Sequence, residues 1–362
     1  MTTSKSSQAA SKKGVWGFIK RIKWWLLGGF ALLALLFCFL VPLPYYVEAP
    51  GGAYDIDQVM TVNGKTNKDK GSYNFVAVEV RPGTVFNLAY SWLNPDTTQI
   101  VSKKELTGGT STKDYELINQ YYMENSQNTA IYQALKLAGK DAKLDYKGVY
   151  VLQVADNSSF KGTLNIADTV TGINGKSFKS SKDLVKYVTG LKLDSQVTVQ
   201  YTSQGKKKSA DGKVVKLKNG KNGIGITLTD HTEVSSNDKV KFSTQGVGGP
   251  SAGLMFTLSI YDQLNKDDLL KGRMIAGTGT IEPDGSVGDI GGVSQKVVSA
   301  DKSGAEIFFV PDNPVAKADK KYYPKGNNYQ EAKKMAKKLG SKMKIVPVKT
   351  AQDAIDYLEK TK

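Results

Sequence analysis

Hydrophobic and polar residues divide the chain into one long apolar segment near its start and a series of shorter patterned segments after it. No charged residue occurs in residues 24–47, and the centre of this segment is almost entirely leucine, phenylalanine, alanine and glycine. Such a length is sufficient to cross a bilayer as a helix. The pattern therefore predicts a transmembrane anchor over residues 24–47, preceded by a short tail over residues 1–23.

After this segment, the period of the hydrophobic positions alternates between that of strands and that of helices. Residues 74–80 alternate as a strand does, and residues 115–138 carry apolar side chains at helical spacings. Over residues 140–225 the pattern changes to short strands with tight turns. From residue 226 to 362, strands alternate with helices, as in an α/β or α+β domain. We therefore expect an α+β chain with a β-rich segment in its middle.

Charges around the apolar segment predict its orientation. The first 23 residues contain six lysines and arginines and no acid, whereas Glu48 and Asp55 follow the segment. Because basic flanks stay on the cytoplasmic side, we expect a single-pass protein of the cell membrane with a cytoplasmic N-terminus and its bulk outside. A cleaved signal peptide is the alternative, although Pro50 directly after Ala49 disfavours cleavage there.

The composition of the chain indicates which binding partners, disulfides and cofactors to expect. The chain has 50 Lys and Arg against 34 Asp and Glu, and the lysines are scattered rather than clustered. This balance suits an anionic cell envelope and predicts no nucleic-acid partner. The one cysteine, Cys38, lies in the apolar segment, so the exported part can hold no internal disulfide. No motif in the sequence predicts a metal or a cofactor.

Residues 246–253 form a glycine-rich turn directly before an apolar run that has the character of a helix. Ser251 lies in this turn, where its hydroxyl can be exposed beside free backbone N–H groups at the start of the helix. An acyl-transfer nucleophile needs this environment. The alternative interpretation is an ordinary N-cap serine in a turn.

A nucleophilic serine also needs a base. The chain contains one histidine, His231, in a polar stretch that we expect to be a loop, and nothing in the sequence brings it to Ser251 in particular. A lysine can act instead if burial depresses its pKa. Lys296 follows two glycines at the start of a predicted helix and precedes two valines, a context that places its amine against protein rather than water.

The serine and lysine motifs together resemble the proteolytic domain of the Lon proteases. The serine motif is Gly-Pro-Ser-Ala-Gly at 249–253, and Lys296 ends the motif Ile-Gly-Gly-Val-Ser-Gln-Lys, 45 positions after the serine. The resemblance implies that Ser251 is the nucleophile, Lys296 the general base and Thr278 a residue that helps to hold the lysine. It also implies that the backbone N–H groups of Gly249 and Ala252 are oxyanion-hole candidates.

Two departures from the Lon pattern qualify what the resemblance implies. Lon proteins usually have Lys-Asp just before the Gly-Pro-Ser, whereas this chain has Val247-Gly248. The sequence also carries no phosphate-binding loop or other ATPase signature. We therefore expect cleavage of flexible peptides or exposed loops without nucleotide.

The β-rich segment resembles a bacterial PDZ domain. The resemblance rests on residues 168–176, Asp-Thr-Val-Thr-Gly-Ile-Asn-Gly-Lys, with Ala167 where the family has glycine. Such domains add extended peptides to a sheet edge beside a helix and a loop of backbone N–H groups. The resemblance implies that this loop is formed by Tyr146, Lys147, Gly148 and Val149. The alternative is an ordinary β-rich insert.

The complete arrangement is similar to the membrane-anchored Lon-like serine proteases of Gram-positive bacteria, a group that includes the enzymes that process secreted competence pheromone peptides. It implies that residues 48–139 begin the protease region, that a PDZ-like domain is inserted over 140–225, and that residues 226–362 form the Lon-type domain. The catalytic part would be extracellular and would act on peptides or proteins, with oligomerisation left open. The alternatives are a non-catalytic envelope adaptor that binds peptides and a Ser-Lys hydrolase of non-peptide acyl groups.

Overall fold

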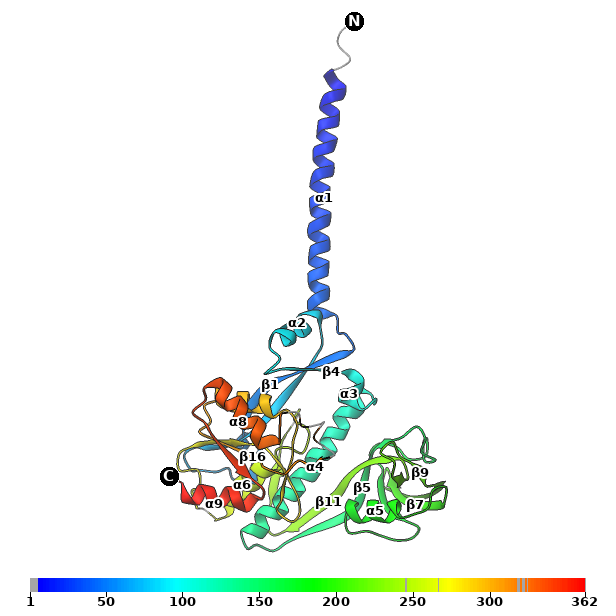
Figure 1. The fold of residues 1–362 in the computed structure, drawn as a ribbon, viewed down its shortest axis with the longest axis vertical. Coiled ribbons are helices and arrows are strands. Elements are labelled where there is room, and N and C mark those ends of the chain that lie inside the picture. The colour runs from blue at the N-terminus through cyan, green and yellow to red at the C-terminus, as the bar shows by residue number, and fades with distance from the viewer. Residues whose placement is uncertain are drawn as a thin grey trace. The chain divides into compact units, whose positions relative to one another are not determined.

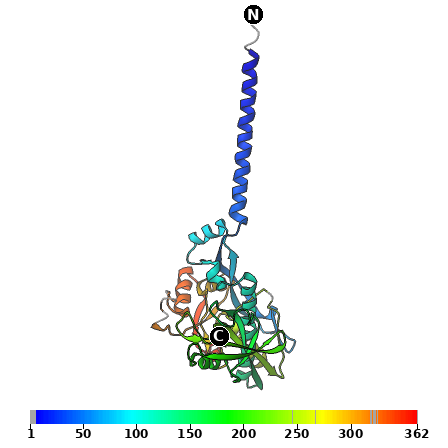
Figure 2. The same cartoon turned by 90° about the vertical axis from the view of Figure 1, so that its right-hand side faces the viewer.

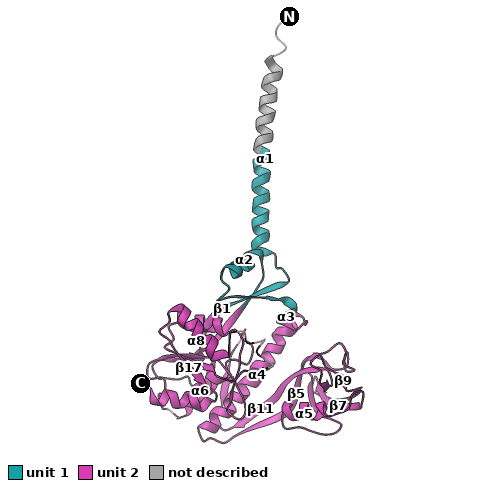
Figure 3. Cartoon of the chain, viewed as in Figure 1, with its two compact units in different colours: residues 1–49, 80–106 teal, residues 50–79, 107–362 magenta. Residues whose placement is uncertain are grey.

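The structure is a computed structural model that describes residues 6–244, 246–265, 267–317, 320, 323 and 325–361, with side chains from residue 22 onward. The chain divides into two compact units (Figure 3). Unit 1 comprises residues 1–49 and 80–106, and unit 2 comprises residues 50–79 and 107–362.

Unit 1 begins with the long helix α1, Ser6–Leu40, which contains a 19-residue apolar segment from Ile22 to Leu40 (Figure 1). The helix ends earlier than the expected residue 47, because Pro42 and Pro44 cannot continue it and Tyr45 already begins strand β1. The unit also holds α2 (Val85–Leu93), β4 (Gln99–Ser102) and most of α3 (Lys103–Thr107). Strand β4 pairs antiparallel with the start of β1.

A six-stranded sheet has the order β17-β16-β13-β3-β1-β4; β17, β16 and β13 belong to unit 2, β4 belongs to unit 1, and β1 (Tyr45–Asp55) and β3 (Ser72–Pro82) run through both units. Strand β13 (Met274–Gly277) pairs parallel with β3 and with β16 (Ile307–Pro311), and β16 pairs parallel with β17 (Lys344–Val348). A parallel sheet needs helices on both faces. From Gly253 to Lys360 helices and strands alternate along the chain, which confirms the expected α+β pattern.

Successive residues of the central strands point to opposite faces of this sheet, as strand geometry requires. Ile275 and Phe309 belong to one hydrophobic core with α6 (Gly253–Asn265) and α9 (Ala351–Lys360). Ala276 and Phe308 belong to a second core with α7 (Val293–Lys302) and α8 (Asn328–Leu339). The two helices that begin near the candidate nucleophile and the candidate base therefore cover opposite faces of the sheet.

The apolar spacing over residues 115–138 corresponds to one continuous helix, α4, Thr112–Leu137. The Ser111 hydroxyl accepts from the Asp114 N–H at its start. Buried small and polar residues such as Ala130, Ala134 and Ser126 let α4 approach α6 closely. Figure 1 shows α4 between the six-stranded sheet and the strands β5 and β11.

A second sheet, five-stranded, has the order β11-β5-β6-β7-β8. Figure 2 views the molecule from the side of this sheet. Its strands, with the helix α5 that packs on them, are β5 (Ala142–Val154), β6 (Thr169–Ile173), α5 (Ser181–Thr189), β7 (Gln196–Ser203), β8 (Lys206–Lys213) and β11 (Ile226–Ser236). A separate hydrophobic core fills it. The lysine-rich strand β8 lacks a hydrophobic alternation, which is why its sequence does not predict it.

Strand β11 differs from what the sequence leads us to expect. The β-rich region was expected to end at residue 225, whereas β11 pairs antiparallel with β5 from Ile226 to Ser236. His231 therefore lies in a strand and not in a polar loop, so that expectation is wrong. The polar residues of β11 conceal the strand in the sequence, and one of them, Thr232, contacts α4: Asn128 donates to the Thr232 carbonyl and the Thr232 hydroxyl donates to Asn125.

Short elements complete the described chain. They are η1 (Ile56–Gln58), β2 (Met60–Val62), β9 (Val215–Lys216), β10 (Asn222–Gly223), β12 (Val240–Phe242), β14 (Thr280–Ile281) and β15 (Val287–Gly288). Strand β12 pairs with β2 and leads directly into the glycine-rich turn. The chain thus runs from the five-stranded sheet through β11 and β12 to Ser251.

Candidate active site

The turn that carries Ser251 is held against helix α4. The Gly249 N–H donates to the Asn119 carbonyl at 2.9 Å, and the Ser126 hydroxyl donates to the Pro250 carbonyl at 2.9 Å. A Cβ on Gly248 would lie 2.7 Å from the Cβ of Asn119, so only glycine allows the turn to approach the helix this closely. The sequence does not identify Asn119 and Ser126, because 124 or more residues separate them from the turn.

Glycine is also required at the start of α6. A Cβ on Gly253 would lie 2.7 Å from Ile281 Cγ2 and 2.8 Å from Ser126 Oγ. The strand after β13 fits into this space and exchanges backbone hydrogen bonds with the turn: Gly279 N–H donates to the Ser251 carbonyl at 2.9 Å, and Leu254 N–H donates to the Gly279 carbonyl at 3.1 Å. These contacts fix the backbone of Ser251, whose side chain stays partly exposed.

Lys296 reaches Ser251 from the opposite face of the sheet. It is the fourth residue of α7, whose preceding residue Gly292 has φ 68° and would place a Cβ 2.5 Å from Val78 Cγ2. The Lys296 Nζ donates to the Ser251 Oγ at 2.7 Å and to the Thr278 Oγ1 at 3.0 Å. The Thr278 hydroxyl in turn donates to the Ser251 carbonyl at 3.2 Å. The structure therefore brings together the three side chains singled out in the sequence.

The lysine amine is shielded from water. Lys296 is 4 % exposed and Thr278 is fully buried. Burial lowers the pKa of Lys296 to about 7, because a charged ammonium loses its hydration there. A neutral amine is the form that can accept a proton from the serine hydroxyl.

The two oxyanion-hole candidates differ in what their N–H groups already bind. The Gly249 N–H is occupied by the Asn119 carbonyl, so it offers no free donor in this structure. Within the parts of the chain that the structure describes, the Ala252 N–H has no hydrogen-bond partner, and Ala252 lies directly after the nucleophile candidate at the entrance to α6. Ala252 is therefore the better candidate of the two.

The expected peptide-binding loop has a different structure. Tyr146, Lys147, Gly148 and Val149 lie inside β5, which pairs with β11 on one side and β6 on the other. The expectation of a loop is therefore wrong, and at Val149 both sides of the strand are already paired. Gly148, at φ 136°, accompanies a β-bulge opposite His231 and Thr232.

In the described structure the five-stranded sheet ends at β11 on one side and at β8 on the other. The residues before β11, 222–225, read Asn-Gly-Ile-Gly and turn sharply at Gly225, where φ is 75°. Helix α5 lies against this strand, because the Ser181 N–H donates to the Asp230 Oδ1 at 2.8 Å. We call residues 222–230 the β11 edge. A Gly-x-Gly before an alternating run is the sequence signal that could have located it.

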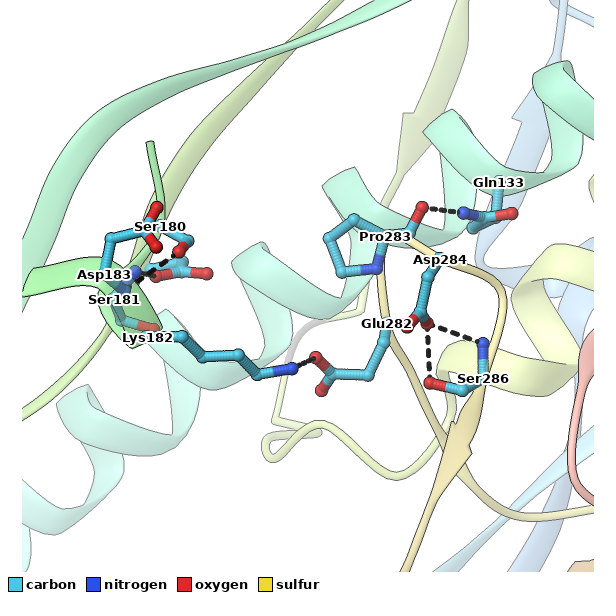
Figure 4. Close-up of polar contacts among 10 residues, drawn as sticks. Gln133, Ser180, Ser181, Lys182, Asp183, Glu282, Pro283, Asp284 and Ser286 are labelled. Carbon is cyan, nitrogen blue, oxygen red and sulfur yellow. Dashed lines mark hydrogen bonds and ion pairs between the residues drawn. The ribbon is translucent and has the colours of Figure 1, made fainter. Parts of the chain in front are cut away.

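The turn that begins at Glu282 contacts both helix α5 and helix α4 (Figure 4). Lys182 of α5 forms an ion pair with Glu282 at 3.2 Å, and Glu282 follows directly on β14. On the other side of the turn, the Gln133 side chain of α4 donates to the Pro283 carbonyl. The turn after Thr278 and Gly279 is thus in contact with the helix beside the β11 edge.

The only histidine is engaged elsewhere. The His231 ring stacks on Tyr150 with centroids 4.0 Å apart, and its Nδ1 is hydrogen-bonded to the Thr169 Oγ1 at 2.9 Å. Burial lowers the pKa of His231. The geometry gives the hydroxyl of Ser251 a lysine partner and not this histidine. A search of the described residues for groups of three or more His, Cys, Asp and Glu that could hold a metal finds none.

Two family models match the chain. The model of the Lon protease (S16) C-terminal proteolytic domain matches residues 207–359, and the model of the PDZ domain matches residues 123–214. A comparison with curated proteins gives no match.

The solved structures that match include two PDZ domains. The PDZ domain of the SdrC-like protein from Listeria monocytogenes is 38 % identical, covers 24 % of this chain and 92 % of its own, with a TM-score of 0.23. That of the SdrC-like protein from Listeria innocua is 36 % identical, covers 23 % and 96 %, with a TM-score of 0.22.

The family matches define the class of protein: the chain carries the proteolytic domain of a Lon-type serine peptidase. It belongs with the Lon-like proteases that combine this domain with a PDZ domain, and it has one N-terminal apolar helix long enough to span a membrane.

Proposed function

We propose that the chain is a membrane-anchored endopeptidase that cleaves extracytoplasmic peptides or proteins through a Ser251–Lys296 dyad, without nucleotide. The observation that carries the proposal is the 2.7 Å distance between Lys296 Nζ and Ser251 Oγ at a buried amine whose pKa is lowered to about 7. A lysine with the usual pKa would be protonated at neutral pH and could not act as a base.

The chemistry follows from these positions. The neutral Lys296 amine takes the proton of the Ser251 hydroxyl as Oγ attacks the peptide carbonyl carbon. The oxyanion of the tetrahedral intermediate accepts from the Ala252 N–H. The Lys296 ammonium then gives its proton to the leaving amine, and an acyl-enzyme remains on Ser251. Water, deprotonated by Lys296, attacks the ester, and the proton returns to the serine.

Thr278 has a positioning role in this scheme. Its hydroxyl accepts from the Lys296 amine and donates to the Ser251 carbonyl, so it connects the base to the backbone of the nucleophile. This orients the amine lone pair toward Ser251 Oγ through the cycle. Thr278 itself exchanges no proton with the substrate.

We place the peptidase outside the cytoplasm because six basic residues precede the apolar part of α1 and acidic residues follow it. The β11 edge would recruit or gate substrates by accepting an extended peptide as an added strand, since β11 ends its sheet and α5 lies against it.

Replacing Ser251 with alanine tests the proposal. The full chain, reconstituted in lipid nanodiscs, would be incubated with a peptide library without nucleotide, and products would be identified by mass spectrometry. We expect S251A to lower the cleavage rate by roughly 10⁴-fold or more. The control is S209A, at an exposed serine of β8, which should cleave normally. Binding of peptides without cleavage by the unaltered chain would favour the adaptor alternative instead.

A further inference from the structure

Helix α2 of unit 1 has an inverted distribution of polar and apolar side chains. It contains no charged residue, and Trp92 and Leu93 are 77 % and 70 % exposed. The polar Ser91, by contrast, is 3 % exposed, and its hydroxyl is hydrogen-bonded to the Thr98 hydroxyl at 2.8 Å. Further apolar side chains on the exposed side of the helix are Val85, Phe86 and Tyr90. A water-exposed helix normally has the opposite distribution.

This helix is attached to the end of the apolar part of α1. The rings of Phe39 and Phe86 are stacked with centroids 4.5 Å apart. The backbone between the two elements is also fixed, since the Leu43 N–H donates to the Gly83 carbonyl at 2.8 Å and the Gly83 N–H donates to the Tyr45 carbonyl at 2.8 Å. The exposed apolar side of α2 is therefore continuous with the apolar surface of α1, both in the teal unit of Figure 3.

We infer that α2 is an interfacial helix that lies in the outer leaflet of the membrane, with the side chains of Trp92, Leu93, Phe86 and Tyr90 in contact with lipid. Tryptophan and tyrosine favour the headgroup region because they have an apolar body and one polar group. An interfacial helix lies in this plane with its apolar side toward the lipid. The occupant is a lipid surface because the same apolar surface continues onto the helix that would span the bilayer.

The inference rests on the proposed anchoring through α1, and a fluorescence experiment separates the two. The full chain carries four tryptophans, of which Trp16, Trp24 and Trp25 would be replaced by phenylalanine. The remaining Trp92 reports its surroundings in phosphatidylcholine–phosphatidylglycerol vesicles through quenching by brominated lipid and by aqueous acrylamide. The control has W92F and L193W in the same background, because Leu193 is a partly exposed apolar residue of the PDZ part.

Each outcome decides the question. Quenching of Trp92 by brominated lipid, with protection from acrylamide and a blue-shifted emission relative to the Leu193→Trp reporter, supports the interfacial helix. Protein that floats with the vesicles but has an acrylamide-accessible, lipid-insensitive Trp92 overturns it and leaves the anchor intact. Protection from acrylamide without lipid quenching identifies a contact with protein and also overturns it. Protein that fails to float overturns the anchoring itself.

Discussion

The catalytic site and the β11 edge lie in the same unit but use different kinds of atoms. The catalytic site consists of the side chains of Ser251, Thr278 and Lys296. The two hydroxyl oxygens lie 2.7 Å and 3.0 Å from the lysine amine. The β11 edge offers backbone N–H and C=O groups along a strand. One changed side chain removes the chemistry of the first, whereas a strand edge keeps its backbone under most substitutions. We therefore expect all-or-none effects at the catalytic site and graded effects at the β11 edge.

The largest effect is expected from K296M. Methionine has a similar length and suits a buried apolar site, so the fold should be retained while the base is lost. We expect the cleavage rate to fall by roughly 10⁴-fold or more. The control is K302M, at an exposed lysine at the end of the same helix. Cleavage by K296M at a substantial fraction of the unaltered rate would show that another group is the base.

The pH dependence of kcat/KM should report the same amine. Because burial lowers the pKa of Lys296 to about 7, the neutral base predominates above this pH and is lost below it. The rate should therefore reach a plateau above about pH 7 and fall about tenfold per unit below it. The profile would be measured from about pH 5 to about pH 9.

His231 is a control for this profile, since histidine can titrate near neutral pH. Its ring is hydrogen-bonded to Thr169 and stacked on Tyr150, away from the dyad chemistry. H231A should keep the acidic limb at the same midpoint. A limb that disappears in H231A would assign the titration to the histidine and contradict the lysine base.

The catalytic site and the β11 edge also differ in how much of each the sequence could predict. Ser251 and Lys296 are identifiable because each follows glycines that allow a backbone approach no other residue permits, as at Gly248 and Gly292. Such local requirements leave a local sequence pattern. The α/β core is identifiable for a similar reason, since its strands are continuous apolar runs between helical patterns.

The rest depends on contacts between distant segments. The pairing of β11 with β5 joins residues such as His231 and Gly148, and the polar residues of β11 conceal the strand in the sequence. The Asn119 carbonyl occupies the Gly249 N–H across an even longer separation in sequence. No pattern within a short window reports either contact, which explains why the sequence predicts a loop at residues 146–149 and a free N–H at Gly249.

A graded effect is expected at the β11 edge from V185D. Val185 lies about one helical turn after Ser181, whose N–H bonds to Asp230 of β11. Its exposed side chain would contact a peptide added to β11. Losing this contact, worth about 1.4 kcal/mol, should raise KM roughly tenfold at unchanged kcat. L193D is the matched control. An equal rise in its KM would show that the effect of V185D does not come from a contact between Val185 and the peptide.

The smallest effect is expected from the ion pair between Lys182 of α5 and Glu282 of the turn after β14. Both side chains are exposed, so a double-mutant cycle with K182A and E282A should give a coupling of about 0.2–1 kcal/mol. The cycle would be measured on kcat/KM for a peptide and repeated at high salt, which should reduce the coupling. The swapped pair, K182E with E282K, should recover the unaltered rate. A coupling that exceeds this range and persists in high salt would mean that the β11 edge and the catalytic turn act as one unit, because a solvated pair alone cannot supply it.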